Sequence, residues 1–133
     1  MTNIKFSQVL FGCLLILMFM RFGIGAEKTY DCEYRHYSDT DGHHRVDGDF
    51  KLKFTVDRAR DEGYMTGNNG RFKVGVIRQP DAITFVEITG TGNVMTTTVD
   101  QKNQSVHSRN TVLFGKLLAS QYYGSCWSFE RVE

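Results

Sequence analysis

Apolar and polar side chains alternate along most of the chain, as they do in strands that bury one face and expose the other. Residues 50–57 (FKLKFTVD) give the clearest case, with four apolar side chains on one face and four polar ones on the other. The same alternation, or a run rich in β-branched residues, predicts further strands. These lie at residues 30–35, 71–76, 82–89, 94–99, 105–114 and 121–132.

Short turn-forming segments separate the predicted strands, such as residues 47–48 (DG), 68–70 (NNG) and 90–93 (GTGN). Connections this short join antiparallel neighbours, because parallel pairing needs a long crossover. We therefore expect an all-β, antiparallel meander of seven to eight strands. Residues 111–120 (TVLFGKLLAS) fit neither the strand nor the helix period, so a short helix is an alternative there.

The first 26 residues predict an N-terminal signal peptide. Lys5 is positively charged, residues 9–20 form an almost entirely apolar run, and Gly25 and Ala26 are small. A membrane-spanning helix needs about 20 residues, so the shorter run favours cleavage, after Ala26, over an uncleaved anchor. Residues 27–133 are then expected to form one small β-barrel domain, periplasmic or secreted.

Charge narrows the class of partner. Removing residues 1–26 takes Lys5 and Arg21 from 16 basic residues and none of the 15 acidic ones, which leaves a net charge of −1. Nucleic-acid-binding proteins and proteins that bind membranes through polybasic patches carry an excess of positive charge. We therefore expect no nucleic-acid partner and no stable membrane insertion after signal cleavage.

Two cysteines remain in the predicted domain, Cys32 and Cys126. An even number of cysteines in an exported chain predicts a disulfide, here joining the first strand to the last. A meander whose end strands lie together closes into a barrel; a β-sandwich is the alternative. The predicted core consists of Phe50, Leu52, Phe54, Phe72, Val74, Val76, Ile83, Phe85, Trp127 and Phe129.

Candidate chemistry is sparse. Residues 38–49 (SDTDGHHRVDGD) gather carboxylates and imidazoles, but they lack the closing glutamate of an EF-hand loop. We interpret them as a solvated loop and predict no metal and no cofactor. Ser105 and His107 share a strand face, and with Asp100 they are the only residues that suggest a hydrolase. No catalytic residue is predicted.

Aromatic side chains gather near the two ends of the predicted domain, and tyrosine and tryptophan are favoured at recognition surfaces. One interpretation is that they pack around the disulfide. The other is a binding edge made of Gln121, Tyr122, Tyr123, Tyr34 and Trp127.

The start at residues 30–32 (YDC), the run of antiparallel strands and the late Cys126 are similar in outline to small periplasmic inhibitors of C-type lysozyme. The resemblance implies an eight-stranded barrel and inhibition of a secreted hydrolase. Those inhibitors use a loop with serine, glycine and tyrosine, and the nearest loop here, residues 90–93, lacks serine and tyrosine. No functional residue therefore carries over.

These observations together predict an exported, non-enzymatic binding or interaction module whose partner is an unidentified protein or small molecule. The alternatives are an inhibitor of a secreted hydrolase and a small-ligand carrier. A carrier requires a cavity of roughly 300 Å³ or more.

Overall fold

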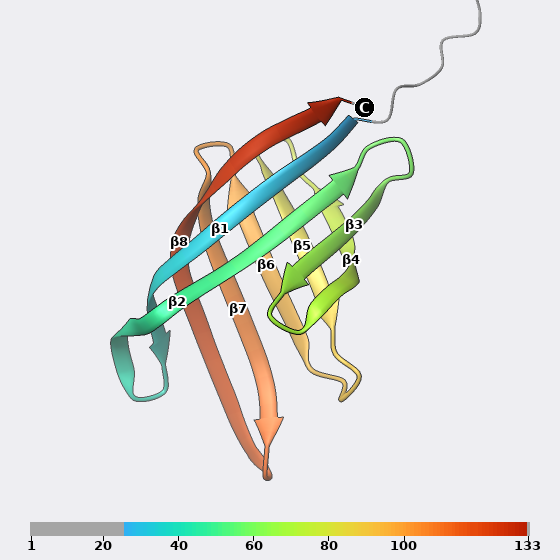
Figure 1. Cartoon of the computed structure of the whole chain (residues 1–133). Coiled ribbons are helices and arrows are strands. Elements are labelled where there is room, and N and C mark those ends of the chain that lie inside the picture. Colours follow the sequence, from blue (N-terminus) through green and yellow to red (C-terminus); the bar gives the residue numbers. More distant parts are fainter. Residues whose placement is uncertain (1–25, 133) are drawn as a thin grey trace, which may run out of the picture.

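The computed structural model describes residues 26–132, so the predicted signal peptide lies outside the described residues except for Ala26. Eight antiparallel strands form a closed barrel in which each strand pairs with the next and β8 pairs with β1 (Figure 1). The predicted all-β barrel is therefore confirmed, and the β-sandwich alternative is wrong. The strands are β1 (Ala26–Asp39), β2 (Gly42–Asp57), β3 (Glu62–Gly67), β4 (Gly70–Arg78), β5 (Ala82–Ile88), β6 (Val94–Asp100), β7 (Gln104–Leu113) and β8 (Lys116–Val132).

The predicted disulfide between Cys32 and Cys126 is present and joins β1 to β8, where the two cysteines lie directly opposite each other. Gly124 lets the same two strands approach closely, because a Cβ atom at this position would collide with the backbone of Glu33 and Tyr34. The seam that closes the barrel thus depends on a covalent link and on a residue without a side chain.

The barrel interior is filled by inward-facing side chains, and the largest apolar ones that are fully enclosed include Tyr34, Phe54 and Phe85. Phe54 and Phe85 stack with their ring centroids 4.4 Å apart. Seven of the ten predicted core residues lie in this core or pack against it. The other three predictions are wrong, because Phe72, Trp127 and Phe129 are exposed.

The wrong core assignments have simple geometric causes. Trp127 and Phe129 alternate with Cys126, and because Cys126 points inward, both point outward. Phe72 shares the inward face of β4 with Val74, but it lies near the end of the strand, where the barrel opens.

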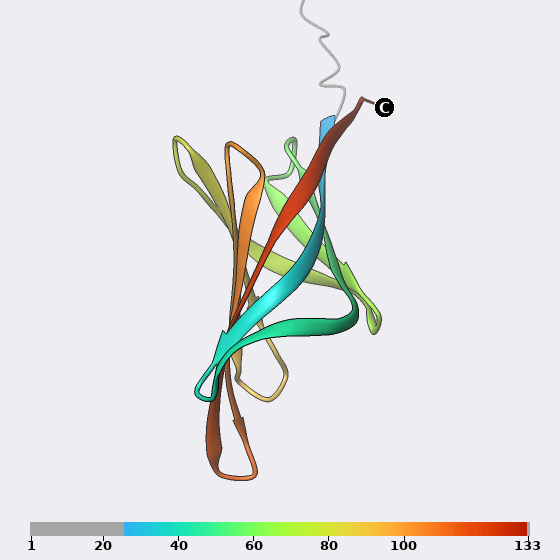
Figure 2. The ribbon, with the colours of Figure 1, turned by 90° about the vertical axis from the view of Figure 1, so that its left-hand side faces the viewer.

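The connections β1–β2, β3–β4, β5–β6 and β7–β8 lie at one end of the barrel, which we call the hairpin end (Figure 1). The β7–β8 hairpin projects beyond the other three, as the side view shows (Figure 2). Residues 111–120 form the end of this hairpin, so the helical alternative is wrong.

The segment 47–48, predicted as a turn, lies inside β2. Residues 46–49 have no partner on β1, because the register passes from His36 opposite Arg45 to Tyr34 opposite Phe50. Gly48 adopts a positive φ of 77°, which glycine allows at little cost. The segment is therefore a bulge that bends β2, and most of the polar stretch 38–49 is strand.

Candidate functional site

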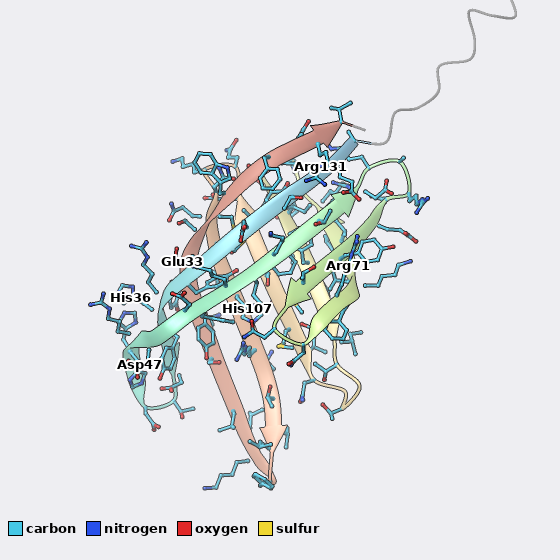
Figure 3. All side chains as sticks on the ribbon, viewed as in Figure 1. Glu33, His36, Asp47, Arg71, His107 and Arg131 are labelled. Carbon is cyan, nitrogen blue, oxygen red and sulfur yellow. A yellow bond between two sulfur atoms is a disulfide. The ribbon has the colours of Figure 1, made fainter. Side chains whose placement is uncertain are left out.

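The barrel interior contains a buried polar cluster made of Tyr34, Thr97, Ser105 and His107, and Figure 3 shows His107 between the strands. The Tyr34 hydroxyl lies 2.9 Å from Ser105 Oγ, and Thr97 Oγ1 lies 2.8 Å from His107 Nδ1. Within residues 26–132, every buried side-chain nitrogen and oxygen has a hydrogen-bond partner. The cluster is thus a satisfied part of the core and not a source of unpaired polar groups.

Arg109 fixes the protonation state of His107. Its Nε donates to His107 Nε2 over 3.1 Å, and since a guanidinium can only donate, Nε2 must accept. The imidazole proton therefore lies on Nδ1, which donates to Thr97. Burial, together with the positive charge of Arg109, lowers the pKa of His107 to about 4. At neutral pH His107 is an uncharged hydrogen-bond acceptor that orients Arg109.

Two aromatic rings hold the same guanidinium. Its central carbon lies 4.7 Å from the ring centroid of Phe50 and 4.9 Å from that of Tyr122, distances at which a cation is attracted to the ring face. No ion pair found within residues 26–132 includes Arg109. Arg109 is therefore a half-buried, oriented cation whose terminal nitrogens suit a planar oxyanion.

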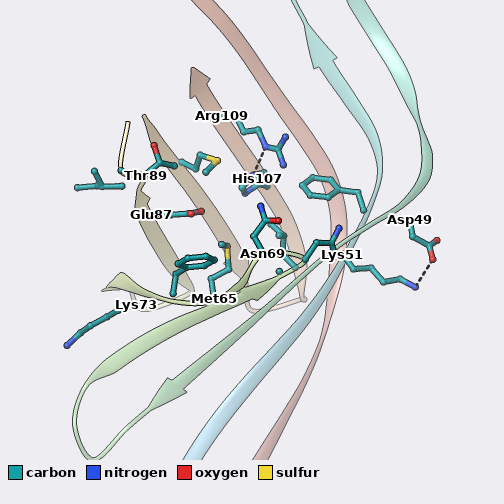
Figure 4. Close-up of a pocket in the computed structure, with 17 residues that line it drawn as sticks. Asp49, Lys51, Met65, Asn69, Lys73, Glu87, Thr89, His107 and Arg109 are labelled. Carbon is teal, nitrogen blue, oxygen red and sulfur yellow. Dashed lines mark hydrogen bonds and ion pairs between the residues drawn. The ribbon is translucent and has the colours of Figure 1, made fainter. Parts of the chain in front are cut away.

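A pocket of about 590 Å³ opens beside Arg109 at the hairpin end (Figure 4). It lies between β2, the β3–β4 hairpin and strands β5 to β7. His107 and Arg109 form part of its lining. The apolar part of the lining comes from Phe50, Leu52, Met65, Phe72, Ile88 and Met95.

The other charged groups of the pocket differ in their pairing. Lys51 pairs with Asp49 at 3.5 Å, and Lys73 pairs with Glu62, which lies outside the lining, at 2.6 Å. Glu87 has no ion pair among the described residues; burial raises its pKa, and the charge of Arg109 opposes that rise.

Glu87 and Arg109 are both opposite Met95, in the β5–β6 and β6–β7 registers respectively. Two strand spacings, about 10 Å, therefore separate their backbones. The pocket thus presents a cation and a carboxylate at two points, in a lining that mixes apolar and polar side chains.

The three residues that suggested a hydrolase do not form a catalytic arrangement. Ser105 bonds to Tyr34, and His107 bonds to Thr97 and Arg109. Asp100 lies at the opposite end of the barrel, where it accepts hydrogen bonds from the backbone N–H groups of the β6–β7 turn.

The five predicted binding-edge residues are distributed over both sides of the barrel wall. Tyr34 is only 1% exposed, and Tyr122 points inward and packs on Phe50. Tyr123, Gln121 and Trp127 face outward, and the Tyr123 hydroxyl donates to the Gln121 side chain. From Gln121 to Ser125, β8 pairs with both neighbours, so no strand edge is open there, whereas Trp127 pairs only with β1.

The polar stretch 38–49 lies at the β1–β2 turn and its flanking strands. Asp39 Oδ1 accepts from the Asp41 backbone N–H and lies 2.9 Å from His44 Nε2, and the Asp41 bond is the largest cause of a lowered Asp39 pKa. His36 and His43 stack at 5.5 Å. The described part of the chain contains no group of three or more His, Cys, Asp or Glu residues placed to hold a metal ion.

Arg109 and Glu87 were absent from the sequence-based candidates. The alternation of β7 places Arg109 on the same face as His107, two positions away, so the sequence pattern was enough to predict that Arg109 points inward. The barrel register, which brings β2, β5 and β7 to one opening, could not be predicted from that pattern.

Comparison with family models, with curated proteins and with solved structures finds no match for this chain. Across residues 26–132, no helix has the length and apolarity that crossing a membrane requires.

Proposed function

We propose that this chain is an exported, non-enzymatic binding module, and that its site is the pocket at the hairpin end. The ligand we infer is a small molecule with an anionic group, such as a carboxylate, and an apolar body. The observation that carries this proposal is Arg109, which His107, Phe50 and Tyr122 orient beside a pocket without supplying an anionic partner.

The dimensions and chemistry of the pocket support a small ligand. Its volume of about 590 Å³ falls within the range of small-molecule sites, and its lining combines six apolar side chains with polar and charged ones. The satisfied buried cluster fixes Arg109 before the ligand arrives, so binding needs little side-chain ordering. Both ring nitrogens of His107 are occupied by hydrogen bonds to Thr97 and Arg109, which supports a positioning role for His107 and hence binding over turnover.

The test is calorimetric titration of the full chain with three eight-carbon probes: octanoate, octylammonium and octanol. We expect octanoate to bind most tightly. Arg109→Met removes the cation and keeps most of the apolar bulk, so it should weaken octanoate binding by roughly tenfold to a hundredfold.

Two matched variants sharpen this test. Lys51→Met also removes a cation from the lining, but Lys51 is exposed and paired with Asp49, so we expect less than about a threefold change. Glu87→Gln removes the nearby negative charge and should tighten octanoate binding. Equal binding of the three probes, or an Arg109→Met variant that binds octanoate like the parent, would contradict the proposal.

A further inference from the structure

The end of the β7–β8 hairpin carries apolar side chains on both faces and at its apex. Val112 and Leu117 lie opposite each other on the outward face, while Leu113 and Leu118 lie on the face that continues the barrel interior. Phe114 lies at the turn and is 97% exposed, and the other four side chains are exposed as well. We call these five residues, with Gly115 and Lys116, the hairpin tip.

The hairpin tip projects without support from neighbouring strands. Pairing of β7 with β6 ends at Asn110, and pairing of β8 with β1 ends at Gln121. Beyond these residues the two strands pair only with each other, apart from one hydrogen bond from the Val112 N–H to Asn93 Oδ1. Phe114 therefore contributes almost no buried apolar area to the barrel, and the other four apolar side chains of the tip stay 46–69% exposed, which folding alone does not explain.

The turn itself carries an unfavourable residue. Phe114 and Gly115 have φ values of 50° and 76° between the paired residues Leu113 and Lys116. Two positive φ angles in a two-residue loop define a type I′ turn, which favours asparagine, aspartate or glycine at both positions. A bulky residue rarely adopts this conformation, so a fully exposed phenylalanine here is costly both to the turn and to hydration. Such strain gathers at functional segments.

We infer that the hairpin tip is a lipid-contacting element that docks the barrel peripherally on a membrane surface. A hairpin that docks in the groove of a protein partner needs only one apolar face. Apolar side chains on both faces and at the apex suit a medium that surrounds the hairpin, such as lipid. The neighbouring β5–β6 connection adds Ile88, exposed by 73%, and Val94, exposed by 41%, to the same end of the barrel.

Charge at the tip is complementary to lipid headgroups. From Asn110 to Ser128 the only charged residue is Lys116, and residues 88–99 contain none. Lys116 lies two residues from Phe114, where its ammonium group can reach a headgroup phosphate while its methylene groups lie among the acyl chains. Asp39, a carboxylate that shares a surface hollow with Asn110 and Ala119 at the base of the hairpin, bonds to His44.

The depth of contact is limited to the interface. The tip spans three residue pairs beyond the supported part of the hairpin, which is about 10 Å at 3.4 Å per residue. Interfacial elements reach about 5–10 Å into the boundary between headgroups and acyl chains. At that depth water still hydrates the outer edges of both strands, so the open edges do not enter the hydrocarbon core. The contact is therefore reversible and does not require a membrane-spanning segment.

The experiment is co-sedimentation of residues 27–133, without the apolar run at 9–20, with large vesicles made either of phosphatidylcholine or of phosphatidylcholine with phosphatidylglycerol. Phe114→Asn places a favoured residue in the turn and removes the apolar apex, so it should fold at least as stably and partition roughly tenfold less onto both vesicles. Lys116→Gln should remove about a fivefold preference for the anionic vesicles and preserve binding to neutral ones.

A matched control and a spectroscopic signal locate the contact. Trp127→Gln deletes an aromatic side chain that is 75% exposed far from the tip, and it should change partitioning less than twofold. In a Trp127→Phe background, Phe114→Trp provides a single tryptophan whose emission should shift to the blue on vesicle addition and be quenched by brominated lipid.

Three results would overturn the inference. One is parent protein that stays in the supernatant with both vesicles, which would leave a soluble protein partner as the occupant of the tip. Another is Phe114→Asn protein that sediments with vesicles like the parent. The third is concentration-dependent dimerisation without vesicle binding, lost in Phe114→Asn, which would assign the tip to a second copy of the chain.

Discussion

The barrel body and the hairpin tip follow opposite rules. In the body, inward side chains are packed, buried polar groups are hydrogen-bonded, and a disulfide closes the seam between β1 and β8. In the tip, apolar side chains face water on both sides, and the turn contains a phenylalanine at a positive φ. Stability explains the packed interior of the body, and it does not explain the tip.

The contrast indicates that the tip residues contribute something other than folding stability. Exposed apolar side chains and an unfavourable turn residue, with no compensating contact in the fold, mark a segment whose role is other than stabilising that fold. The pocket beside Arg109 is an intermediate case, because its cation is built into the satisfied core yet has no anionic partner among the described residues. This contrast can be tested with substitutions that should change the free energy of unfolding strongly in the body and weakly in the tip.

The largest expected effect comes from removing the covalent closure. Cys32 and Cys126 are 94 residues apart in sequence, and on the chain-entropy model opening a loop of this size lowers the free energy of unfolding by about 4–5 kcal/mol. Urea unfolding of the double variant Cys32→Ala/Cys126→Ala measures this directly. The reduced parent should match it, and equal stability with and without the bridge would show that strand pairing alone closes the barrel.

Matched truncation of two phenylalanines tests the contrast itself. Phe85 is buried against Phe54, so Phe85→Ala leaves a cavity and should lower the free energy of unfolding by about 3–5 kcal/mol. Phe114→Ala should change it by no more than about 0.5 kcal/mol, because Phe114 is exposed. Urea unfolding of both variants provides the comparison. A cost above about 2 kcal/mol for Phe114→Ala would mean that the tip packs on the body in solution.

Acid should weaken the body through His107. Its folded-state pKa of about 4 lies below the unfolded value of 6.5, so the unfolded chain binds a proton first as the pH falls. The stabilising contribution is complete above pH 6.5 and is lost progressively toward pH 4, by about 3 kcal/mol at most.

Unfolding curves between pH 7 and pH 4 measure this loss. The lowered pKa values of Glu62 and Asp39 change stability mainly below pH 4.5. The raised pKa of Glu87 acts in the opposite direction to that of His107, because the folded chain binds this proton first as the pH falls. His107→Gln should flatten the dependence between pH 6.5 and pH 5, and an unchanged slope in that variant would assign the acid sensitivity elsewhere.

The alternation of side chains was enough to predict most strands, because a barrel with a packed interior and a wet exterior imposes a period of two. It failed at β3, where one of the two buried inward positions is Gly63. A Cβ atom there would collide with the Val76 side chain, so the core at this point is filled from β4. A strand that contributes no side chain at an inward position shows no alternation there.

Residues 111–120 show no strand periodicity for a different reason. Beyond Asn110 and Gln121 the hairpin has no inside, so neither face is selected to be polar. The pocket was beyond sequence reasoning, because the shared position of Glu87 and Arg109 on either side of Met95 depends on the exact registers of β5, β6 and β7. Their separation along the chain carries no sign of it.

The smallest expected effect concerns the turn at the apex. Phe114→Asn relieves a strained left-handed residue, and Gly115→Ala introduces one, since Gly115 has a φ of 76°. Each change should alter the local opening free energy of the hairpin by about 1 kcal/mol, in opposite directions. Amide hydrogen exchange at the end of β7 should therefore slow roughly fivefold in the first variant and quicken similarly in the second.

The exchange rates of the core strands should not change in either variant, because the tip opens independently of the body. Faster exchange in Phe114→Asn would show that the phenylalanine stabilises its own turn through contacts in solution, and the tip would then follow the same rule as the barrel.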